Sequence, residues 1–135
     1  MTETRGDRNN NPGNLRVNAT QWVGEIGDDG EFIIFDSALH GIRALARTLV
    51  TYQTKDKCTT VQSIINRWAP PVENDTGSYV NDVCRRTGML PSSVPSLTSG
   101  STDLQDLVTA IIWHENGACI YSDSLIANAC ALALS

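Results

Sequence analysis

The sequence predicts an α+β fold that is mostly helical, with about five helices and one small β-hairpin. Two β-rich runs, at residues 22–26 and 31–35, flank a Gly-Asp-Asp-Gly turn at 27–30, which is the pattern of a hairpin. After residue 36 the apolar residues recur at three- and four-residue spacing, which is the period of a helix. A length of 135 residues predicts one domain over 1–135 with one hydrophobic core.

The first elements are set by turn chemistry and helix caps. Residues 9–14, Asn-Asn-Asn-Pro-Gly-Asn, predict a rigid loop, because Asn and Gly tolerate left-handed angles and Pro fixes its φ. Asp36 or Ser37 can cap a helix that runs to about residue 52. Thr59 and Gln62 form a capping-box pattern for a short helix that Pro70 and Pro71 end.

Three more helices follow. One begins after residue 76 and stops at Gly88, and another covers 104–116 and stops at Gly117. The last, from about 122 to 134, carries little charge, so we expect it to be central or heavily covered. Trp68 and Trp113 are expected in the core.

Composition limits the classes of partner and cofactor. A net charge of −5 argues against a nucleic-acid binder, although arginines cluster in the first third of the chain and could face an anionic polymer. No apolar run is long enough for a membrane span, and the N-terminus has no apolar secretory signal, so export would depend on another factor. We expect a monomer without metal or cofactor. The four cysteines have no zinc-site spacing, and free thiols and disulfides both remain open.

Glu115 is the candidate catalytic residue. It ends the most apolar helical run of the chain, directly before Gly117, and lies beside the stripe that includes Ile111 and Ile112. Glycoside hydrolysis needs a protonated carboxyl next to the scissile oxygen, and an apolar setting favours that form. On position alone, however, a Glu in a last helical turn can also be an ordinary exposed side chain.

A second carboxylate commonly directs water or stabilises the positive charge in such reactions. Glu25 on the hairpin is the preferred candidate, and Glu73 in the loop after the Pro-Pro pair is the other. Aromatic rings could carry sugar rings, and asparagines could bind N-acetyl groups. These substrate-binding candidates are Trp22, Tyr79 and Tyr121, together with Asn11, Asn14 and Asn74.

A thiol–imidazole pair is the nucleophilic alternative. Cys84 or Cys119 with His40 or His114 could serve a cysteine-dependent peptidoglycan amidase or peptidase. No cysteine sits at a polar helix start that would activate it. There is also no Gly-rich phosphate loop to support nucleotide chemistry.

Four motifs in the first part of the chain carry a family resemblance. They are Asn-Pro-Gly-Asn-Leu-Arg at 11–16, Trp-Val-Gly at 22–24, Phe-Ile-Ile-Phe-Asp-Ser at 32–37 and His-Gly-Ile-Arg-Ala-Leu at 40–45. In this order they resemble bacteriophage peptidoglycan-degrading proteins of the lysozyme-like superfamily, and are similar to autolysin-type glucosaminidases. In those enzymes the catalytic Glu precedes the series, at a helix end, in a Glu-Ser-Gly-like sequence.

Here the matching piece follows the series, as Glu-Asn-Gly at 115–117, which looks like a circular permutation. Permutation preserves packing when the joined ends are close and exposed. The resemblance implies a lysozyme-like domain with the hairpin as its small lobe, and a muramidase or lytic transglycosylase that acts on bacterial peptidoglycan with Glu115 as general acid. It implies synthesis in the host cytoplasm and action in the periplasm, or carriage in the virion. A binding or structural virion module without catalysis is the rival from another class.

Overall fold

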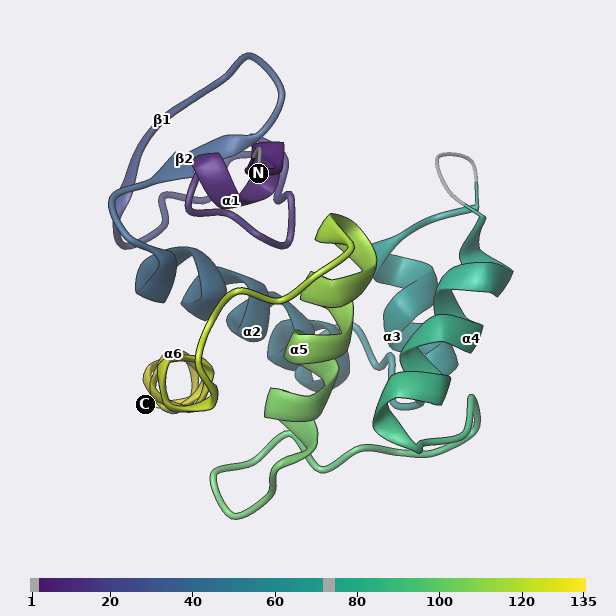
Figure 1. The fold of residues 1–135 in the computed structure, drawn as a ribbon. Helices are drawn as coiled ribbons and strands as arrows, with labels where there is room; N and C mark the ends of the chain where they lie inside the picture. The colour runs from purple at the N-terminus through teal and green to yellow at the C-terminus, as the bar shows by residue number, and fades with distance from the viewer. Residues whose placement is uncertain (1–2, 72–74) are drawn as a thin grey trace.

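The computed structural model describes residues 3–71 and 75–135, and it confirms a mostly helical fold with one small antiparallel hairpin (Figure 1). The elements in chain order are α1 (Arg5–Arg8), β1 (Glu25–Asp28), β2 (Ile33–Phe35), α2 (Ala38–Thr54), α3 (Val61–Trp68), α4 (Thr76–Thr87), α5 (Asp103–Asn116) and α6 (Asp123–Leu134). The hairpin and α1 form a small lobe, and α3 and α4 lie on the opposite side of α5 (Figure 1).

The helix α1 was not predicted, because a single four-residue turn carries no hydrophobic period. Thr4 caps it, and its hydroxyl accepts a hydrogen bond from the Asp7 N–H. The loop that follows has the left-handed angles expected of its asparagines, with φ of 53° at Asn10 and 52° at Asn14. The predicted turn is therefore confirmed.

Asn11 holds this loop against the hairpin. The side chain is fully buried, and its Nδ2 donates to the carbonyl oxygens of Leu15 and Ile33. Its Oδ1 accepts from the Leu15 N–H. The sequence-based assignment of Asn11 to an N-acetyl group is thus wrong, because all of these side-chain hydrogen bonds go to the backbone.

The hairpin is confirmed, with shifted bounds. Glu25 pairs with Phe35, and a bulge separates this pair from Gly27 opposite Ile34. The first strand begins at Glu25 rather than at residue 22, because residues 22–25 form a turn in which the Glu25 N–H donates to the Trp22 carbonyl. Backbone pairing therefore starts only after this turn.

Arg5 fixes the hairpin to α1. Its guanidinium donates to Asp29 at 2.6 and 2.9 Å and to Glu31 at 2.9 Å, and it lies over the Phe32 ring. The Arg5 hydrogen bond is the main cause that lowers the pKa of Asp29. These contacts join the two ends of the small lobe.

Side-chain caps set the starts of α2 and α3. Ser37 caps α2 through the His40 N–H, as predicted. The capping box of α3 is formed by Thr60 and Ser63 instead of Thr59 and Gln62, one residue later than predicted. The Ser63 hydroxyl reaches the Thr60 N–H at 2.9 Å and closes the box.

Glycines end the next two long helices as predicted. α4 ends at Gly88 with φ of 77°, and α5 ends at Gly117 with φ of 74°. Such left-handed angles are nearly free of strain only for glycine. The end of α5 fixes where its last side chains project.

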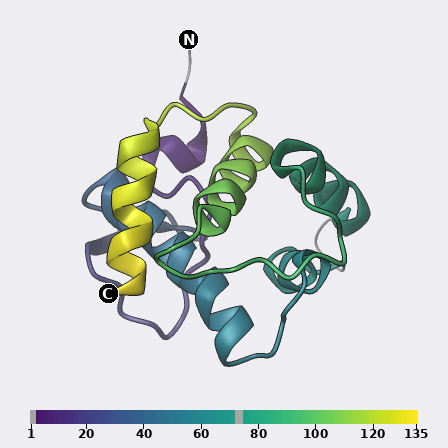
Figure 2. The same cartoon turned by 90° about the horizontal axis from the view of Figure 1, so that it is seen from below.

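The last helix, α6, lies at the edge of the molecule beside α2, which corrects the expectation of a heavily covered element (Figure 2). Its buried stripe consists of Ile126, Ala129, Cys130 and Ala133, while Leu132 is 40% exposed. Alanine-rich sequence is uncharged but carries little apolar area, so low charge does not imply burial on all sides.

The apolar side chains form two core clusters. The larger one contains side chains from each of the helices α2, α3, α4, α5 and α6. The smaller one joins the small lobe to α2 and contains Leu15, Ile33, Phe35 and Ala44. Trp68 is half-buried and packs against both clusters, whereas Trp113 is 36% exposed with Arg86 over its ring. The prediction that Trp113 is a core residue is therefore wrong.

All four cysteines, Cys58, Cys84, Cys119 and Cys130, are free thiols. Burial raises the pKa of Cys130 to about 12 and also raises the pKa values of Cys84 and Cys119. Among the described residues, no helix is long and apolar enough to cross a membrane.

Candidate functional site

A cleft of about 760 Å³ lies between the small lobe and the helices. Its walls come from the loop after α1, the hairpin, one side of α2 and the end of α3. The aromatic lining consists of Trp22, Phe32, Tyr52 and Trp68, and the basic lining of Arg16, Arg47 and Lys55. Among the described residues that line this cleft, Glu115 is the one carboxylic acid.

Glu115 lies in the last turn of α5, and its side chain is half-buried. Its Oε1 accepts a hydrogen bond from Asn14 Nδ2 at 2.9 Å, and its Oε2 accepts one from the Tyr79 hydroxyl at 2.7 Å. The carboxyl group is thus held from two sides, by the loop after α1 and by α4. The structure brings three of the predicted site residues together.

Tyr79 donates to Glu115 because its other partner can only donate. The Trp68 indole Nε1–H reaches the Tyr79 oxygen at 3.1 Å, and an indole N–H has no acceptor role. The phenol proton is therefore left for Glu115. Tyr79 is 2% exposed, and burial together with the charge of Glu115 raises its pKa far above the usual range, so it remains a donor.

A histidine–aspartate pair supports Tyr79 from behind. The His114 ring lies against the Tyr79 ring with centroids 3.7 Å apart, and its Nδ1 is 2.9 Å from Asp82 Oδ2. Burial alone would raise the pKa of Asp82, but hydrogen bonds from His114 and Arg86 hold it below its ordinary value. This pair was not anticipated, although Tyr79 and Asp82 have the i, i+3 spacing of neighbours on a helix.

Asn116 fastens the loop after α1 to the end of α5. Its Nδ2 donates to the Pro12 carbonyl at 2.8 Å, and its Oδ1 accepts from the Thr4 hydroxyl at 2.6 Å. The residue next to Glu115 thereby positions the segment that carries Asn14. The Asn-Pro-Gly-Asn and Glu-Asn-Gly motifs are in direct contact.

Trp22 lines the cleft, where a sugar platform is expected, and it also packs against the small-lobe cluster. Trp68 lines it as well, although its sequence context suggested a core role. The α2 side of the cleft was missed. Its residues recur at helical spacing on the polar side of α2, which is the signal that could have identified them: Arg47, Thr48, Thr51, Tyr52 and Lys55.

Other predicted residues lie elsewhere. Glu25 is on β1, is not among the described residues that line the cleft, and its carboxylate accepts from the Trp22 N–H at 3.3 Å. A role beside Glu115 stays a prediction. Glu73 and Asn74 lie outside the described residues.

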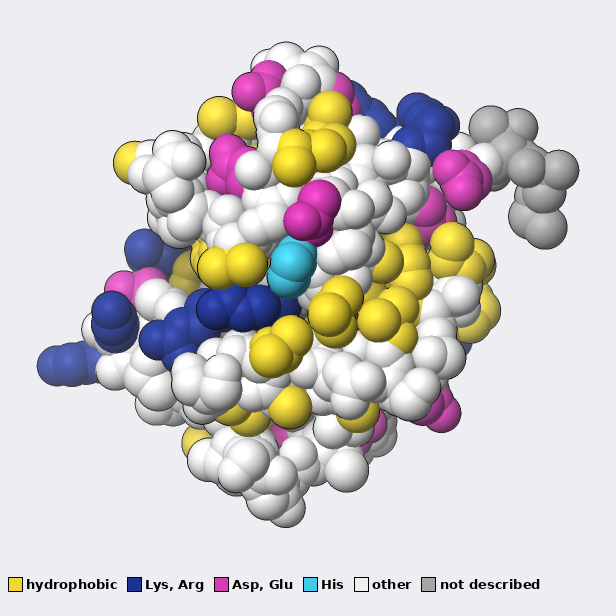
Figure 3. All heavy atoms as spheres, turned by 90° about the vertical axis from the view of Figure 1, so that its left-hand side faces the viewer, with side chains coloured by type: hydrophobic (Ala, Val, Ile, Leu, Met, Phe, Trp, Pro, Cys, Tyr) yellow, Lys and Arg dark blue, Asp and Glu magenta, His cyan; other side chains and the backbone are white. Residues whose placement is uncertain are grey.

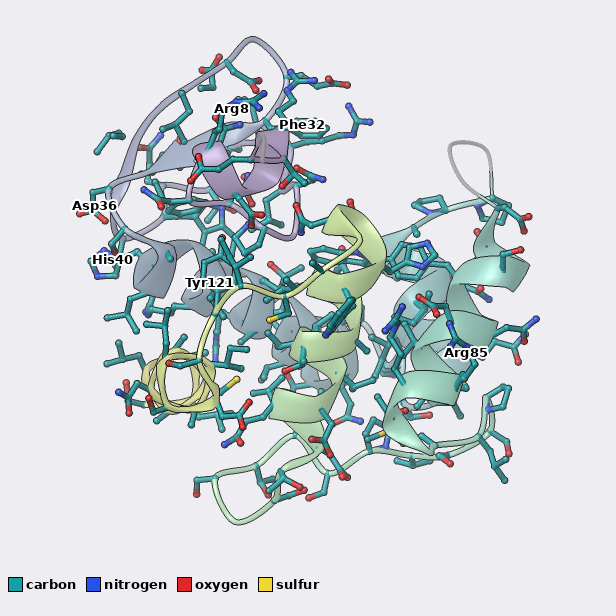
Figure 4. All side chains as sticks on the ribbon, viewed as in Figure 1. Arg8, Phe32, Asp36, His40, Arg85 and Tyr121 are labelled. Carbon is teal, nitrogen blue, oxygen red and sulfur yellow. The ribbon has the colours of Figure 1, made fainter. Side chains whose placement is uncertain are left out.

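Tyr121 is not among the described residues that line the cleft, and its role as a substrate platform stays a prediction. Figure 4 shows it on the side of α5 away from α4. Its hydroxyl donates to Asp7 Oδ1 at 2.6 Å, and burial together with Asp7 raises its pKa. The bond ties the start of α6 to α1, which is a structural role.

Neither histidine of the thiol–imidazole alternative is hydrogen-bonded to a cysteine within the described part of the chain. His40 Nδ1 is 2.7 Å from Asp36 on the surface, and His114 is bonded to Asp82 (Figure 4 labels the His40 pair). Over the same ranges, no group of three or more His, Cys, Asp and Glu side chains is arranged to hold a metal ion.

Charge is unevenly distributed over the surface. On the face drawn in Figure 3, basic side chains gather in a band across the middle left and in a second group at the upper right, while acidic ones lie mainly in the upper half. No acidic partner of Arg43, Arg47 or Lys55 is found among the described residues, and the latter two line the cleft. A protein with net charge −5 thus has a locally basic cleft wall.

No family model matches the chain. The chain is 39% identical, over 113 residues, to Protein P5 of Pseudoalteromonas phage PM2, and the match covers 76% of this chain and 71% of the phage protein. Identity at this level over most of both chains shows common descent. The protein therefore belongs to the family of Protein P5 of this bacteriophage.

Proposed function

We propose that the protein cleaves the glycan strand of bacterial peptidoglycan, with Glu115 as the general acid. The observation that carries the proposal is the placement of this carboxyl group, the one acid among the described cleft-lining residues, held by Tyr79 and Asn14. A proton donor must be held close to the oxygen that it protonates, and two fixed hydrogen bonds serve that purpose.

One carboxyl group is sufficient for a substrate-assisted reaction. Glu115 gives its proton to the glycosidic oxygen as the bond to the sugar carbon breaks. The substrate's own N-acetyl oxygen or 6-hydroxyl then attacks that carbon, so no enzyme nucleophile is needed. Attack by the 6-hydroxyl returns its proton to the Glu115 carboxylate, which restores the acid and gives the anhydro product of a lytic transglycosylase. Attack by the N-acetyl oxygen gives a cyclic oxazolinium ion; water then opens it and returns a proton to Glu115, which is the outcome of a muramidase. Glu25 or Glu73 would add a second carboxylate only in a hydrolysis without this substrate assistance.

The cleft walls suit a charged glycan. Aromatic side chains such as Trp22 and Tyr52 offer flat apolar surfaces to sugar rings. Arg47 and Lys55 match the carboxylates of a peptidoglycan polymer. Kinship with a phage protein supports a role in opening the host envelope, either as a lysis enzyme in the periplasm or as part of the virion.

The contact between the two sequence motifs also supports the resemblance to the lysozyme-like superfamily. In the proposed permuted order, the helix that bears the acid must lie beside the Asn-containing loop. Asn116 meets Pro12 and Thr4, and Glu115 meets Asn14. The permutation remains a proposal that rests on this contact and on the order of the motifs.

The test is lysis of permeabilised Gram-negative cells, followed as loss of turbidity. Glu115→Gln should abolish it, because the amide cannot donate a proton as an acid, while binding to purified cell walls remains. Glu3→Gln, at an exposed position outside the cleft, is the matched control and should lyse cells like the wild type. Unchanged lysis by the Glu115 variant would exclude it as the acid.

Mass spectrometry of digested cell walls distinguishes the remaining classes. Anhydro-muramic ends indicate a lytic transglycosylase, and reducing muramic ends indicate a muramidase. Wall binding without any new ends would favour the non-catalytic module. Cut peptides together with sensitivity to iodoacetamide would favour the cysteine-dependent alternative.

A further inference from the structure

The two ends of the Asn14 side-chain amide are in unequal environments. Nδ2 donates to Glu115 Oε1 at 2.9 Å, whereas Oδ1 is buried and no donor from residues 3–71 or 75–135 reaches it. Buried amide oxygens usually have a hydrogen-bond partner, so an orphaned one next to a proposed catalytic acid needs an explanation.

The surroundings of this Oδ1 are built for a donor. It faces Gly6 of α1, and a methyl group on Gly6 would lie 2.9 Å from Asn116 Oδ1 and 3.0 Å from both Asn11 O and Asn14 Oδ1. Three acceptor oxygens thus converge on one point. If the Asn14 amide rotated by 180°, its NH₂ group would take the place of the third acceptor and face the other two.

The charge of Glu115 decides between the two orientations. The Tyr79 hydroxyl must donate to Oε2, because the Trp68 N–H that reaches it is itself a donor. Oε1 is therefore the oxygen of Glu115 whose hydrogen-bond partner can change. A carboxylate at Oε1 needs the Asn14 NH₂, and a protonated Oε1–H can instead donate to Asn14 Oδ1. The orientation present here is the one that fits the carboxylate.

We propose that Asn14 is a positioning residue whose side-chain amide rotates by half a turn with each gain or loss of the proton on Glu115. This rests on the proposed function, in which Glu115 is the acid. With the proton on Oε1, the amide presents Oδ1 to Glu115 and turns its NH₂ group toward Asn116 Oδ1 and the Asn11 carbonyl oxygen, which also accept from the Thr4 hydroxyl and the Asn14 N–H. When the glycan binds, the Oε1–H turns from Asn14 Oδ1 to the glycosidic oxygen. As the glycosidic C–O bond breaks, the Oε1–H bond breaks too, a new O–H bond forms on the leaving sugar, and Nδ2 turns back to the carboxylate.

Other titratable groups around Glu115 remain in one state or can be followed separately. Tyr79 stays protonated, because burial and the charge of Glu115 raise its pKa. The groups are Tyr79 on α4, the His114–Asp82 pair between α5 and α4, Arg16 from the loop after α1, Arg47 from α2, and Lys55 at the C-cap of α2. The ring protons of His114 report its own titration by NMR.

The orientation can be read from nuclear Overhauser contacts of the Asn14 NH₂ protons, assigned by their loss in Asn14→Asp. We expect contacts to the Gly6 Hα at low pH and their loss at high pH. The pH at which the contacts are half lost should equal the midpoint of the alkaline limb of the lytic rate. Glu115→Gln should show these contacts at every pH, because its C=O accepts from Tyr79 and its NH₂ requires Asn14 Oδ1. Absence of the contacts both in that variant and in the wild type at low pH overturns the proposal.

Two variants separate this role from a merely structural one. Both Asp and Gly accept the left-handed φ of 52° at this position. Asn14→Asp can accept the Glu115 proton but cannot donate to the carboxylate, so the alkaline limb should move up by about one pH unit or more. Asn14→Gly should lower the rate without that shift. Equal losses with an unmoved limb in both variants overturn the proposal.

Failure of this inference and failure of the proposed function give different results. If Glu115→Gln still lyses cells, Glu115 is not the acid, whatever the orientation of Asn14. If that variant is inactive and the Gly6 contacts never appear, Glu115 keeps its role and Asn14 does not rotate.

Discussion

At the scale of the residue, Tyr79 packs in the core and also donates a hydrogen bond to Glu115, and its sequence context did not distinguish these two roles. Helical spacing marked it as an inward-facing residue, and its chemistry suggested a sugar platform. The structure shows a buried phenol between the Trp68 indole and the Glu115 carboxyl. Periodicity identifies which side of a helix is buried but not what lies opposite, so the hydrogen-bonded chain could not be derived from the sequence.

Tyr79→Phe should lower the lytic rate at least about tenfold, because the acid loses one of its two positioning bonds. It should cost about 1–3 kcal/mol of stability, since the Trp68 N–H loses its acceptor. Rates on cell walls and denaturant unfolding measure the two effects. Tyr121→Phe is the matched control, because it also removes one hydroxyl hydrogen bond, the one to Asp7, but lies outside the cleft lining. Equal rates for the two variants would contradict the role of Tyr79.

Asn14, Tyr79 and Glu115 were each chosen for sugar chemistry, and they meet in space. Glu25 and Tyr121 were chosen by the same reasoning, yet their polar atoms bond to Trp22 and to Asp7. A residue type states what a side chain can do. Which of these side chains face one cleft depends on contacts between segments about a hundred positions apart.

At the scale of the element, helix starts and stops were readable because caps act locally. Ser37, Gly88 and Gly117 end or begin their helices as expected. The four-residue α1 was not predicted, because tertiary contacts with Asp29, Glu31 and Asn116 hold it in place instead of its own helix propensity. The burial of α6 was predicted wrongly, because small uncharged residues occupy both the covered and the exposed sides of this Ala-rich helix.

The first turn of α2 touches the backbone of the asparagine loop. A Cβ on Gly41 would lie 1.7 Å from the Asn10 carbonyl oxygen, and backbone cannot yield as a side chain does. Gly41→Ala should therefore destabilise the protein by about 3 kcal/mol or more. Gly77→Ala in α4, whose Cβ would meet no atom closer than 3.8 Å, should instead stabilise it by up to about 1 kcal/mol. Thermal unfolding of the two variants checks both signs, and a stable Gly41 variant would refute the close contact.

At the scale of the whole molecule, an acidic protein has a basic cleft wall. The sequence showed the uneven arginines but not their neighbours, and Arg5 and Arg16 prove to be engaged with acids of the hairpin. The basic groups that remain toward the cleft are Arg47 on α2 and Lys55 at its C-cap. Charge counted along a chain does not tell which charges are already paired, and pairing decides what a partner meets.

Binding to purified cell walls should weaken with added salt, because exposed opposite charges are screened within about 10 Å at 0.1 M ionic strength. Lys55→Glu should weaken binding severalfold at low salt and flatten the salt dependence. Lys57→Glu, an exposed lysine outside the cleft lining, should do neither. Sedimentation with cell walls at several salt concentrations measures the effect, and identical curves for the two variants would remove the cleft from the binding surface.

The bonds that Asn14 and Thr4 form with residues 115 and 116 span 101 and 112 positions of the chain. Contacts between residues so far apart in the sequence close large loops. Closing such a loop costs conformational entropy before the contact adds any stability. The constellation around Glu115 should consequently be among the last parts to assemble during folding. A nascent chain on the ribosome would have no finished acid site until residues 115 and 116 had left the exit tunnel.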